Sequence, residues 1–321
     1  RFMGPAALGL DGNGSLYISD STNNTIRKLV VANNAVTTIA GAAPMYGQTN
    51  GTGAAARFAA PFGITADNAG NLYTVDLQGN TVRKIVQATG AVTTIAGSGG
   101  ASGSTDGTGA AARFNFPQGV AFDSSGKLYI ADTGNHTIRM VTLSNNAVTT
   151  IAGMAGNPDS TDGTGTAAGF DTPTSVAWDG NGNLYIVDSG NSTIRKMVVA
   201  TGVVTTIAGM AGASGTADGT GSAARFDSPH GAVIDGAGNL YVSEPNSFTI
   251  RKLVVVSGVV TTIAGSAGTA GKSDGTGTAA QFAQPMGLSL DGMGNLYIAD
   301  ASNNAIRKLV LASGAVTTVI G

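Results

Sequence analysis

The sequence has no cysteine and is poor in charged residues. Without cysteine in its 321 residues, the chain can form neither disulfides nor thiolate metal sites. Charged residues make up 11% of it and the formal net charge is −2, so it has no electrostatic footprint for nucleic acid or an anionic membrane. No apolar run approaches the roughly 18 residues of a membrane span. We therefore expect neither a nucleic-acid partner nor a membrane-spanning segment.

Groups that perform catalysis are equally scarce. The two histidines, His136 and His230, are too few for a three-histidine zinc site. No serine lies in a nucleophile-elbow motif, and His230 with nearby Asp227 makes only half of an acid–base pair. We assign no catalytic residue and expect a protein that is not an enzyme.

What the chain does contain is one 56-residue unit repeated six times. A Leu-Tyr pair recurs at this spacing without insertion or deletion, beginning at Leu16, Leu72, Leu128, Leu184, Leu240 and Leu296. An arginine keeps the same step, at Arg27, Arg83, Arg139, Arg195, Arg251 and Arg307. A fixed period of this length is the signature of a repeat architecture.

The third copy shows what one unit builds. Short runs of β-branched and aromatic residues, separated by Gly, Asn and Ser, predict four strands at 119–123, 127–132, 137–143 and 147–152. A long polar connection follows at 153–168, and one short helical turn is expected near 110–114.

Four antiparallel strands joined by tight turns bury little on their own, so six such sheets must pack face to face around an axis. We predict an all-β, six-bladed β-propeller with four antiparallel strands per blade, forming a single domain over 1–321. The expected blades are 1–56, 57–112, 113–168, 169–224, 225–280 and 281–321.

The third copy also carries a family resemblance. Pro117-x-Gly-Val-Ala-x-Asp, followed by Leu-Tyr-Ile-Ala-Asp-Thr-Gly-Asn135-His136-Thr-Ile-Arg, resembles the NHL repeat, and the other copies keep the frame. The resemblance implies a six-bladed propeller. It leaves function open, because the family includes lyases, RNA-binding modules and protein-binding scaffolds.

Each second strand ends in an acid. These residues are Asp20, Asp76, Asp132, Asp188, Glu244 and Asp300. Around one mouth they offer oxygen ligands for a divalent cation such as calcium. The alternative is structural: each acid has an arginine seven residues on, which a tight turn brings to a diagonal position on the same face. Six local pairs are neutral, whereas an unpaired acid ring repels itself, so we favour the structural interpretation and expect no cofactor.

The long connections carry Asp-Gly-Thr-Gly, beginning at Asp106, Asp162, Asp218 and Asp274, with Asn50 in the first copy. One acid per loop is too few for a calcium loop. We expect a turn that leads into a short helical segment, with Asp106 as its cap.

Positions where the copies differ in kind are the candidates for specific binding. The residue after the repeated proline begins the innermost strand and is expected near the rim of the axial channel. It varies among Ala6, Phe62, Gln118, Thr174, His230 and Met286. The turns after the second strands also vary, and we include their residues His136, Glu244 and Phe248. The alternative explanation is drift in exposed loops.

We therefore expect an exported bacterial binding or interaction module, extracellular or at the cell surface, whose ligand is a protein or a small molecule. A self-assembling structural subunit and a metal-dependent hydrolase or lyase at the channel mouth remain alternatives. The first residue is Arg1 rather than methionine, from which we expect a processed or excised chain. The last and first blades lack the long connection found at the other five junctions, so we expect their contact to rest on face packing alone and to open first.

Overall fold

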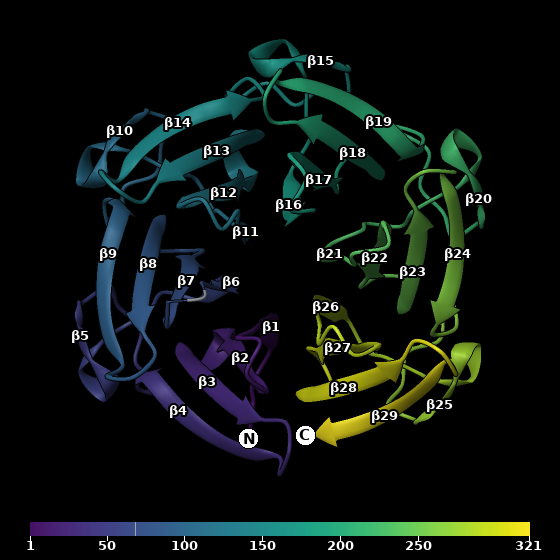
Figure 1. Cartoon of the computed structure of the whole chain (residues 1–321), viewed down its shortest axis with the longest axis horizontal. Helices are drawn as coiled ribbons and strands as arrows, with labels where there is room; N and C mark the ends of the chain where they lie inside the picture. Colours follow the sequence, from purple (N-terminus) through teal and green to yellow (C-terminus); the bar gives the residue numbers. More distant parts are fainter. Residues whose placement is uncertain (68) are drawn as a thin grey trace.

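The structure is a computed structural model that describes residues 1–67 and 69–321. Six antiparallel sheets stand as blades around a central axis, with the strand order following the chain from the axis outward (Figure 1). The predicted six-bladed β-propeller is confirmed.

Every blade contains the same four-stranded meander. The innermost strands are β1 (Pro5–Leu10), β6 (Pro61–Ala66), β11 (Gly119–Phe122), β16 (Pro173–Trp178), β21 (Ala232–Ile234) and β26 (Pro285–Leu290). The second strands are β2 (Ser15–Asp20), β7 (Asn71–Asp76), β12 (Lys127–Asp132), β17 (Asn183–Asp188), β22 (Asn239–Glu244) and β27 (Asn295–Asp300). The third strands are β3 (Thr25–Val30), β8 (Thr81–Val86), β13 (Thr137–Thr142), β18 (Thr193–Val198), β23 (Thr249–Val254) and β28 (Ala305–Val310). The fourth strands are β4 (Ala35–Gly41), β9 (Ala91–Gly97), β14 (Ala147–Ala152), β19 (Val203–Gly209), β24 (Val259–Ala264) and β29 (Ala315–Ile320).

The expectation of four strands per blade holds for blade 1, and the other five sheets have a fifth. Each long connection lays two residues along the fourth strand of the blade it leads into. These short strands are β5 (Gly51–Thr52), β10 (Gly107–Thr108), β15 (Gly163–Thr164), β20 (Gly219–Thr220) and β25 (Gly275–Thr276). Sequence patterning missed them because two residues are too few to show a period.

In the part of the chain that the structure describes, the helical content is limited to single 3-10 turns. They are η1 (Ser21–Asn23), η2 (Gly53–Ala55), η3 (Gly109–Ala111), η4 (Thr133–Asn135), η5 (Gly165–Ala167), η6 (Gly221–Ala223) and η7 (Gly277–Ala279). The expected turn near 110–114 is thus present as η3, but Asp106 does not cap it: the turn has no side-chain cap. None of the helices in the described ranges is long and apolar enough to span a membrane.

The apolar core lies between neighbouring blades, because successive side chains of each second strand point to opposite faces of the sheet. In β12, Leu128 and Ile130 pack in one cluster with Tyr73 and Val75 of blade 2. Tyr129 and Ala131, on the opposite face, pack in the next cluster with residues of blade 4. Both faces of each sheet are therefore apolar, and no blade buries its core without its neighbours.

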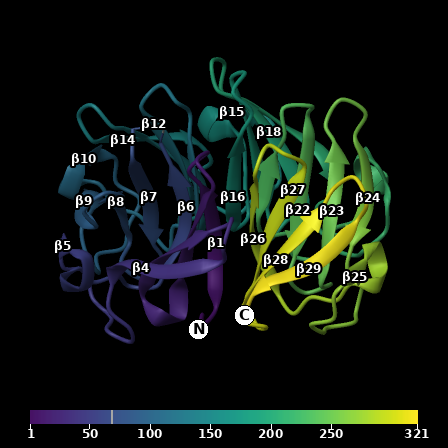
Figure 2. The same cartoon turned by 60° about the horizontal axis from the view of Figure 1, so that its bottom comes forward.

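The two ends of the chain lie side by side where blade 6 meets blade 1 (Figure 2). Phe2, Leu8 and Ile18 of blade 1 form one buried cluster with Tyr297 and Ile306 of blade 6. The expectation that this contact rests on face packing alone is wrong, because Gly4 N–H also donates a hydrogen bond of 2.9 Å to Asn304 Oδ1.

Candidate functional site: the mouth of the axial channel

The repeated acids are joined to the repeated arginines inside each blade. In blade 3, Arg139 Nη1 lies 2.7 Å from Asp132 Oδ2, and neither side chain is exposed. The guanidinium also lies over the Phe114 ring, 5.2 Å from its centroid. The other carboxylate oxygen accepts the Asn115 backbone N–H. The same acid–arginine pair forms in all six blades, at 2.7–3.1 Å.

This arrangement bears on the cation candidates. The five aspartates at the ends of the second strands are fully buried, and their carboxylate oxygens already accept hydrogen bonds from arginine and backbone N–H groups. They are Asp20, Asp76, Asp132, Asp188 and Asp300. Burial raises the pKa of Asp76, Asp132 and Asp188 to about 6, against the opposing effect of the paired arginines. Within residues 1–67 and 69–321, no group of three or more His, Cys, Asp or Glu side chains is arranged to hold a metal ion.

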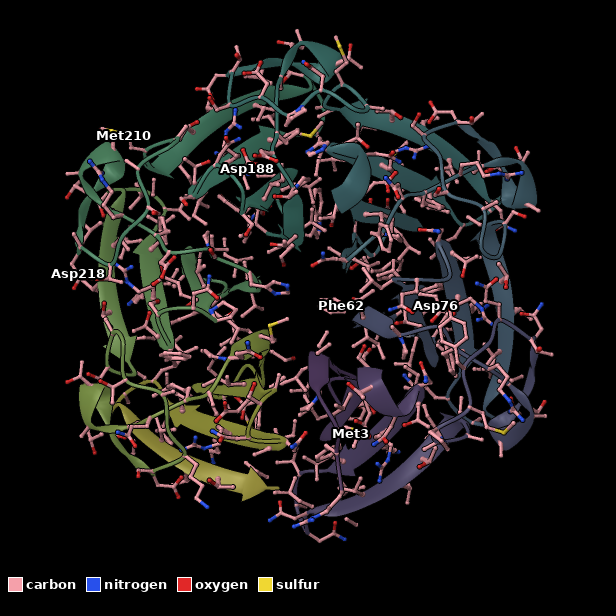
Figure 3. The ribbon with its side chains drawn as sticks, turned by 180° about the vertical axis from the view of Figure 1, so that it is seen from behind. Met3, Phe62, Asp76, Asp188, Met210 and Asp218 are labelled. Atoms are coloured by element: carbon pink, nitrogen blue, oxygen red, sulfur yellow. The ribbon has the colours of Figure 1, made fainter. Side chains whose placement is uncertain are left out.

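The acid of Asp-Gly-Thr-Gly has a role that sequence reasoning missed. Asp106 Oδ1 accepts Arg139 Nη2 at 2.8 Å and the Thr150 hydroxyl at 2.9 Å. Burial acts to raise its pKa, but hydrogen bonds from Thr150 and Arg139 outweigh it and lower the pKa. Asp218, its counterpart in blade 5, lies at the outer rim of the ring (Figure 3). These acids fasten each connection to its blade.

Turn residues after the second strands link neighbouring blades. Asn80 and His136 adopt left-handed backbone conformations, with φ of 54° and 59°. Asn80 Oδ1 accepts the Phe116 N–H at 2.8 Å, and His136 Nδ1 accepts the Thr172 N–H at 3.0 Å. His136 Nδ1 also lies 3.4 Å from Asp171 Oδ1, in the same segment as Thr172.

Close backbone approach sets the position of the inner strands. A Cβ on Gly119 would lie 2.7 Å from Cα of Ser175 in the next blade, so this site requires glycine. Gly63 N–H donates to the Gln118 carbonyl at 2.9 Å, and the Thr174 hydroxyl donates to the His230 carbonyl at 2.8 Å. The Pro-x-Gly motif therefore brings the strand beginnings together around the axis, with the variable residue between Pro and Gly.

Two hollows lie along that axis. The first, about 450 Å³, is at the beginnings of the inner strands and is lined by Phe62, Gln118, Thr174 and His230, among others. The second, about 810 Å³, is at the strand ends and is lined by apolar residues including Phe122 and Trp178. Of the residues lining the two hollows, only His230 has a titratable side chain. We call the first hollow the channel mouth; the Phe62 label in Figure 3 marks its edge, beside the central opening.

Three variable side chains meet across the channel mouth. His230 Nε2 lies 3.1 Å from Gln118 Oε1, although blade 4 lies between the blades that carry them. The Phe62 ring is tilted against the imidazole with centroids 5.5 Å apart. His230 Nδ1 is completely buried and has no hydrogen-bond partner in the described part of the chain. Burial lowers the pKa of His230 to about 4, so the ring is neutral at physiological pH.

The other predicted binding residues lie elsewhere. Met286 precedes the lining residue Gly287, and its carbonyl accepts the Ser243 hydroxyl. Glu244 is fully buried and paired with Arg251 at 2.9 Å, and burial raises its pKa. His136 links two blades, and Phe248 is a half-buried turn residue with φ of 62°. The channel mouth thus brings together Phe62, Gln118, Thr174 and His230, and does not include Glu244, His136 or Phe248.

Two exposed apolar side chains in the segments ahead of the inner strands were not among the predicted site residues. Met3 is 52% exposed and Phe116 is 49% exposed. Each lies within two residues of the proline that begins its blade. Their signal was available in the sequence, since a methionine and a phenylalanine stand at positions where a loop has no need of apolar groups.

Comparison with known proteins agrees with this architecture. The NHL repeat family model matches residues 114–139, the segment that holds Asp132, His136 and Arg139. The chain thus carries an NHL repeat within a six-bladed β-propeller. It is 29% identical over 97% of its length to "Protein SUPPRESSOR OF QUENCHING 1, chloroplastic" of Arabidopsis thaliana, covering 30% of that protein. Over 64% of its length it is 31% identical to "NHL repeat-containing protein 2" of Gallus gallus, covering 31% of it. The NHL propeller therefore spans less than a third of the length of these relatives.

Among solved structures, the propeller resembles one described as an auxiliary nutrient binding protein from Bacteroides ovatus. The TM-score is 0.70 with 18% sequence identity, covering 99% of this chain and 70% of the other. At this identity the likeness shows the fold alone.

Proposed function

We propose that this propeller is a non-enzymatic binding module that takes a small, uncharged ligand at the channel mouth. The observation that carries the proposal is His230 Nδ1, a buried polar atom without a hydrogen-bond partner in the described residues. Most other such atoms belong to threonines and arginines that recur from blade to blade, whereas His230 lines the channel mouth, and leaving its Nδ1 unpaired costs about 1–3 kcal/mol. A ligand that donates a hydrogen bond to this nitrogen, once the imidazole turns it toward the hollow, removes that cost.

The tautomer of His230 defines the ligand's polar group. Gln118 Oε1 is an acceptor only, so His230 Nε2 must carry the proton and donate to it. Because the ring is neutral, Nδ1 then presents a lone pair. The matching ligand group is a hydroxyl or an N–H.

Shape and charge define the rest of the ligand. The Phe62 ring provides an apolar face at the channel mouth, and no charged side chain is among its lining residues. The ligand class that fits is a neutral ring compound with one apolar face and donor groups on its edge, which describes sugars and nucleosides. The nutrient-binding description of the Bacteroides ovatus relative is in keeping with this class.

We include export to the cell surface and independence from metal ions in the proposal. The absence of cysteine and the low charge suit an exported protein. The buried acids are engaged by arginines in every blade, so the site needs no cation to neutralise them.

Saturation-transfer NMR tests the proposed ligand class. The probes are D-glucose, N-acetyl-D-glucosamine and uridine, and we expect at least one to receive saturation from the protein. Phe62→Ala and His230→Leu should abolish the signal, whereas Met293→Ala, at a side chain that is 80% exposed and outside the channel mouth, should leave it unchanged. No signal from any probe, or a signal that survives both mouth variants, contradicts the proposal.

A further inference from the structure

The axial channel has a second hollow at its other end, where the inner strands finish. Its volume is about 810 Å³, against about 450 Å³ at the channel mouth, and residues from the ends of all six inner strands line it. No charged side chain is among these lining residues. We call it the strand-end hollow.

The last residue of each inner strand differs in kind from blade to blade. Four blades have an aliphatic side chain there, and blades 3 and 4 have the aromatic Phe122 and Trp178. Each of these half-buried rings stacks on a tyrosine of the preceding blade. The ring centroids of Phe122 and Tyr73 are 6.2 Å apart, and those of Trp178 and Tyr129 are 5.5 Å apart. The two stacks fix the rings in place, so the hollow has a preorganised aromatic wall.

The wall across the axis from the aromatic pair offers polar groups. Strands β11 and β16 lie side by side, opposite β26 and β1 (Figure 1). Ser289 of β26 and Thr65 of β6 contribute hydroxyls to the lining, and between them β1 contributes Gly9, which has no side chain. In the described part of the chain, each inner strand pairs with a second strand along one edge, and its other edge presents backbone N–H and C=O groups to the axis.

We propose that the strand-end hollow binds a small, neutral aromatic molecule that has a polar group on its edge. The ring of the ligand stacks against Phe122 and Trp178, and its polar group meets the hydroxyls of Thr65 and Ser289 or the backbone edges. An aromatic wall with a few polar groups opposite it is the composition of small-molecule sites in general. A charged ligand is disfavoured, because the hollow has no opposite charge to replace the water that the ligand loses on entry.

Trp178 gives this hollow its own optical signal, because it is the only tryptophan in the sequence. The probe is 2-naphthol, which absorbs light where tryptophan emits, so its binding beside Trp178 should quench the emission until the site is saturated. Two related compounds define the ligand class. Naphthalene-2-sulfonate has the same rings with a charge, and cyclohexanol has a hydroxyl without an aromatic ring. Each should displace 2-naphthol only at concentrations about tenfold higher or more, since stacking and neutrality both contribute to binding.

Two substitutions alter the hollow with side chains that other blades already have at the same position. Phe122→Ala introduces the residue of blade 2 and removes one aromatic face, whereas Ala66→Leu introduces the residue of blade 1 and fills part of the hollow. Each should weaken 2-naphthol binding by about fivefold or more. Val256→Ala is the matched control: this side chain is 94% exposed and does not line the hollow, so binding should not change.

The channel-mouth variants Phe62→Ala and His230→Leu separate the two hollows, and quenching by 2-naphthol should be the same in both as in the native chain. Four results overturn the proposal. They are absence of saturable quenching, binding of naphthalene-2-sulfonate as tight as that of 2-naphthol, quenching that survives both Phe122→Ala and Ala66→Leu, and quenching that is lost in the channel-mouth variants. Because the strand-end hollow lies at the other end of the inner strands, absence of quenching leaves the proposal for the channel mouth standing.

Discussion

Asp132 and Arg139 form a buried ion pair, 2.7 Å apart, whose arginine also reaches the acid of the connection, Asp106. The two acids that meet this arginine differ sharply in exposure, 0% for Asp132 and 48% for Asp106. Burial decides how much each contributes, because a charge without its partner costs most where water cannot reach it.

Asp132→Ala should therefore destabilise the protein by about 3–5 kcal/mol, since it leaves the Arg139 charge buried with only half of its partners. Asp106→Asn should cost less than about 1 kcal/mol, because the pair is screened by solvent and Asn50 performs the same role in blade 2. Urea unfolding measures both. Equal losses in the free energy of unfolding would show that burial does not determine how much each of the two carboxylates contributes to stability.

His230 should make stability depend on pH. Its folded-state pKa of about 4 lies below the value of 6.5 for an unperturbed histidine, so the unfolded state binds the proton more readily. The stabilisation is fully present above pH 6.5 and is lost as the pH falls toward 4. At about 1.4 kcal/mol per pKa unit, the loss approaches about 3 kcal/mol.

The measurement is the free energy of unfolding at pH 7 and pH 4 for the native chain and for His230→Gln. The buried carboxylates titrate in both proteins, so their contribution cancels in the difference. The native chain should lose about 3 kcal/mol more than the variant. If the free energy of unfolding falls equally in both proteins between pH 7 and pH 4, the prediction is contradicted. The His230 imidazole would then be solvated, or protonated, in the folded protein.

Loss of the Asn304–Gly4 hydrogen bond should weaken the contact between blades 6 and 1 more than loss of the equivalent hydrogen bond weakens the contact between two other blades. Asn304→Ala and Asn80→Ala each remove one such bond, worth about 1 kcal/mol. Blades 2 and 3 remain tethered by a connection, which keeps their faces at high effective concentration. Within residues 1–321 no connection joins blades 6 and 1.

We therefore expect Asn304→Ala to speed amide exchange in β1 by about fivefold, because a loss of about 1 kcal/mol is smaller than the about 1.4 kcal/mol that corresponds to a tenfold change. Asn80→Ala should change exchange in β11 by less. Hydrogen exchange followed by mass spectrometry measures the exchange rates in β1 and β11 of the two variants. Faster exchange in blades 3 and 4 than in blades 1 and 6 would contradict the prediction.

Metal removal should have no effect on folding. The acids at the ends of the second strands are neutralised by arginines within their own blades, so EDTA should leave the melting temperature unchanged. Addition of calcium in excess should not raise it either. A calcium-dependent rise of several degrees would reveal a cation site that these pairs do not account for, since a ligand stabilises the state that binds it.

Much of the fold could be predicted from the sequence because the same pattern of strands and turns recurs in all six copies. The strands at 127–132 and 147–152 were placed to the residue, and the acid–arginine pairs followed from their seven-residue spacing. The fifth strands could not be predicted, because Gly107 and Thr108 have no pattern of their own and are held by a distant partner, β14.

The channel mouth was less accessible to sequence reasoning. That Phe62, Gln118, Thr174 and His230 begin inner strands follows from the repeat. That Gln118 meets His230 depends on the close approach of blades around the axis, which no local pattern encodes. Glu244 shows the opposite difficulty: it differs in kind from the five aspartates, yet its carboxylate pairs with Arg251 just as theirs do with their own arginines.

The central claim is that the channel mouth holds a small uncharged ligand. The most direct measurement is a crystal structure of the protein purified from its native source and not exposed to added ligands. The account predicts density for a non-water molecule with a donor group within about 3 Å of His230 Nδ1 and an apolar face against Phe62. Density for water alone at that nitrogen, with Gln118 and His230 unchanged, would contradict it.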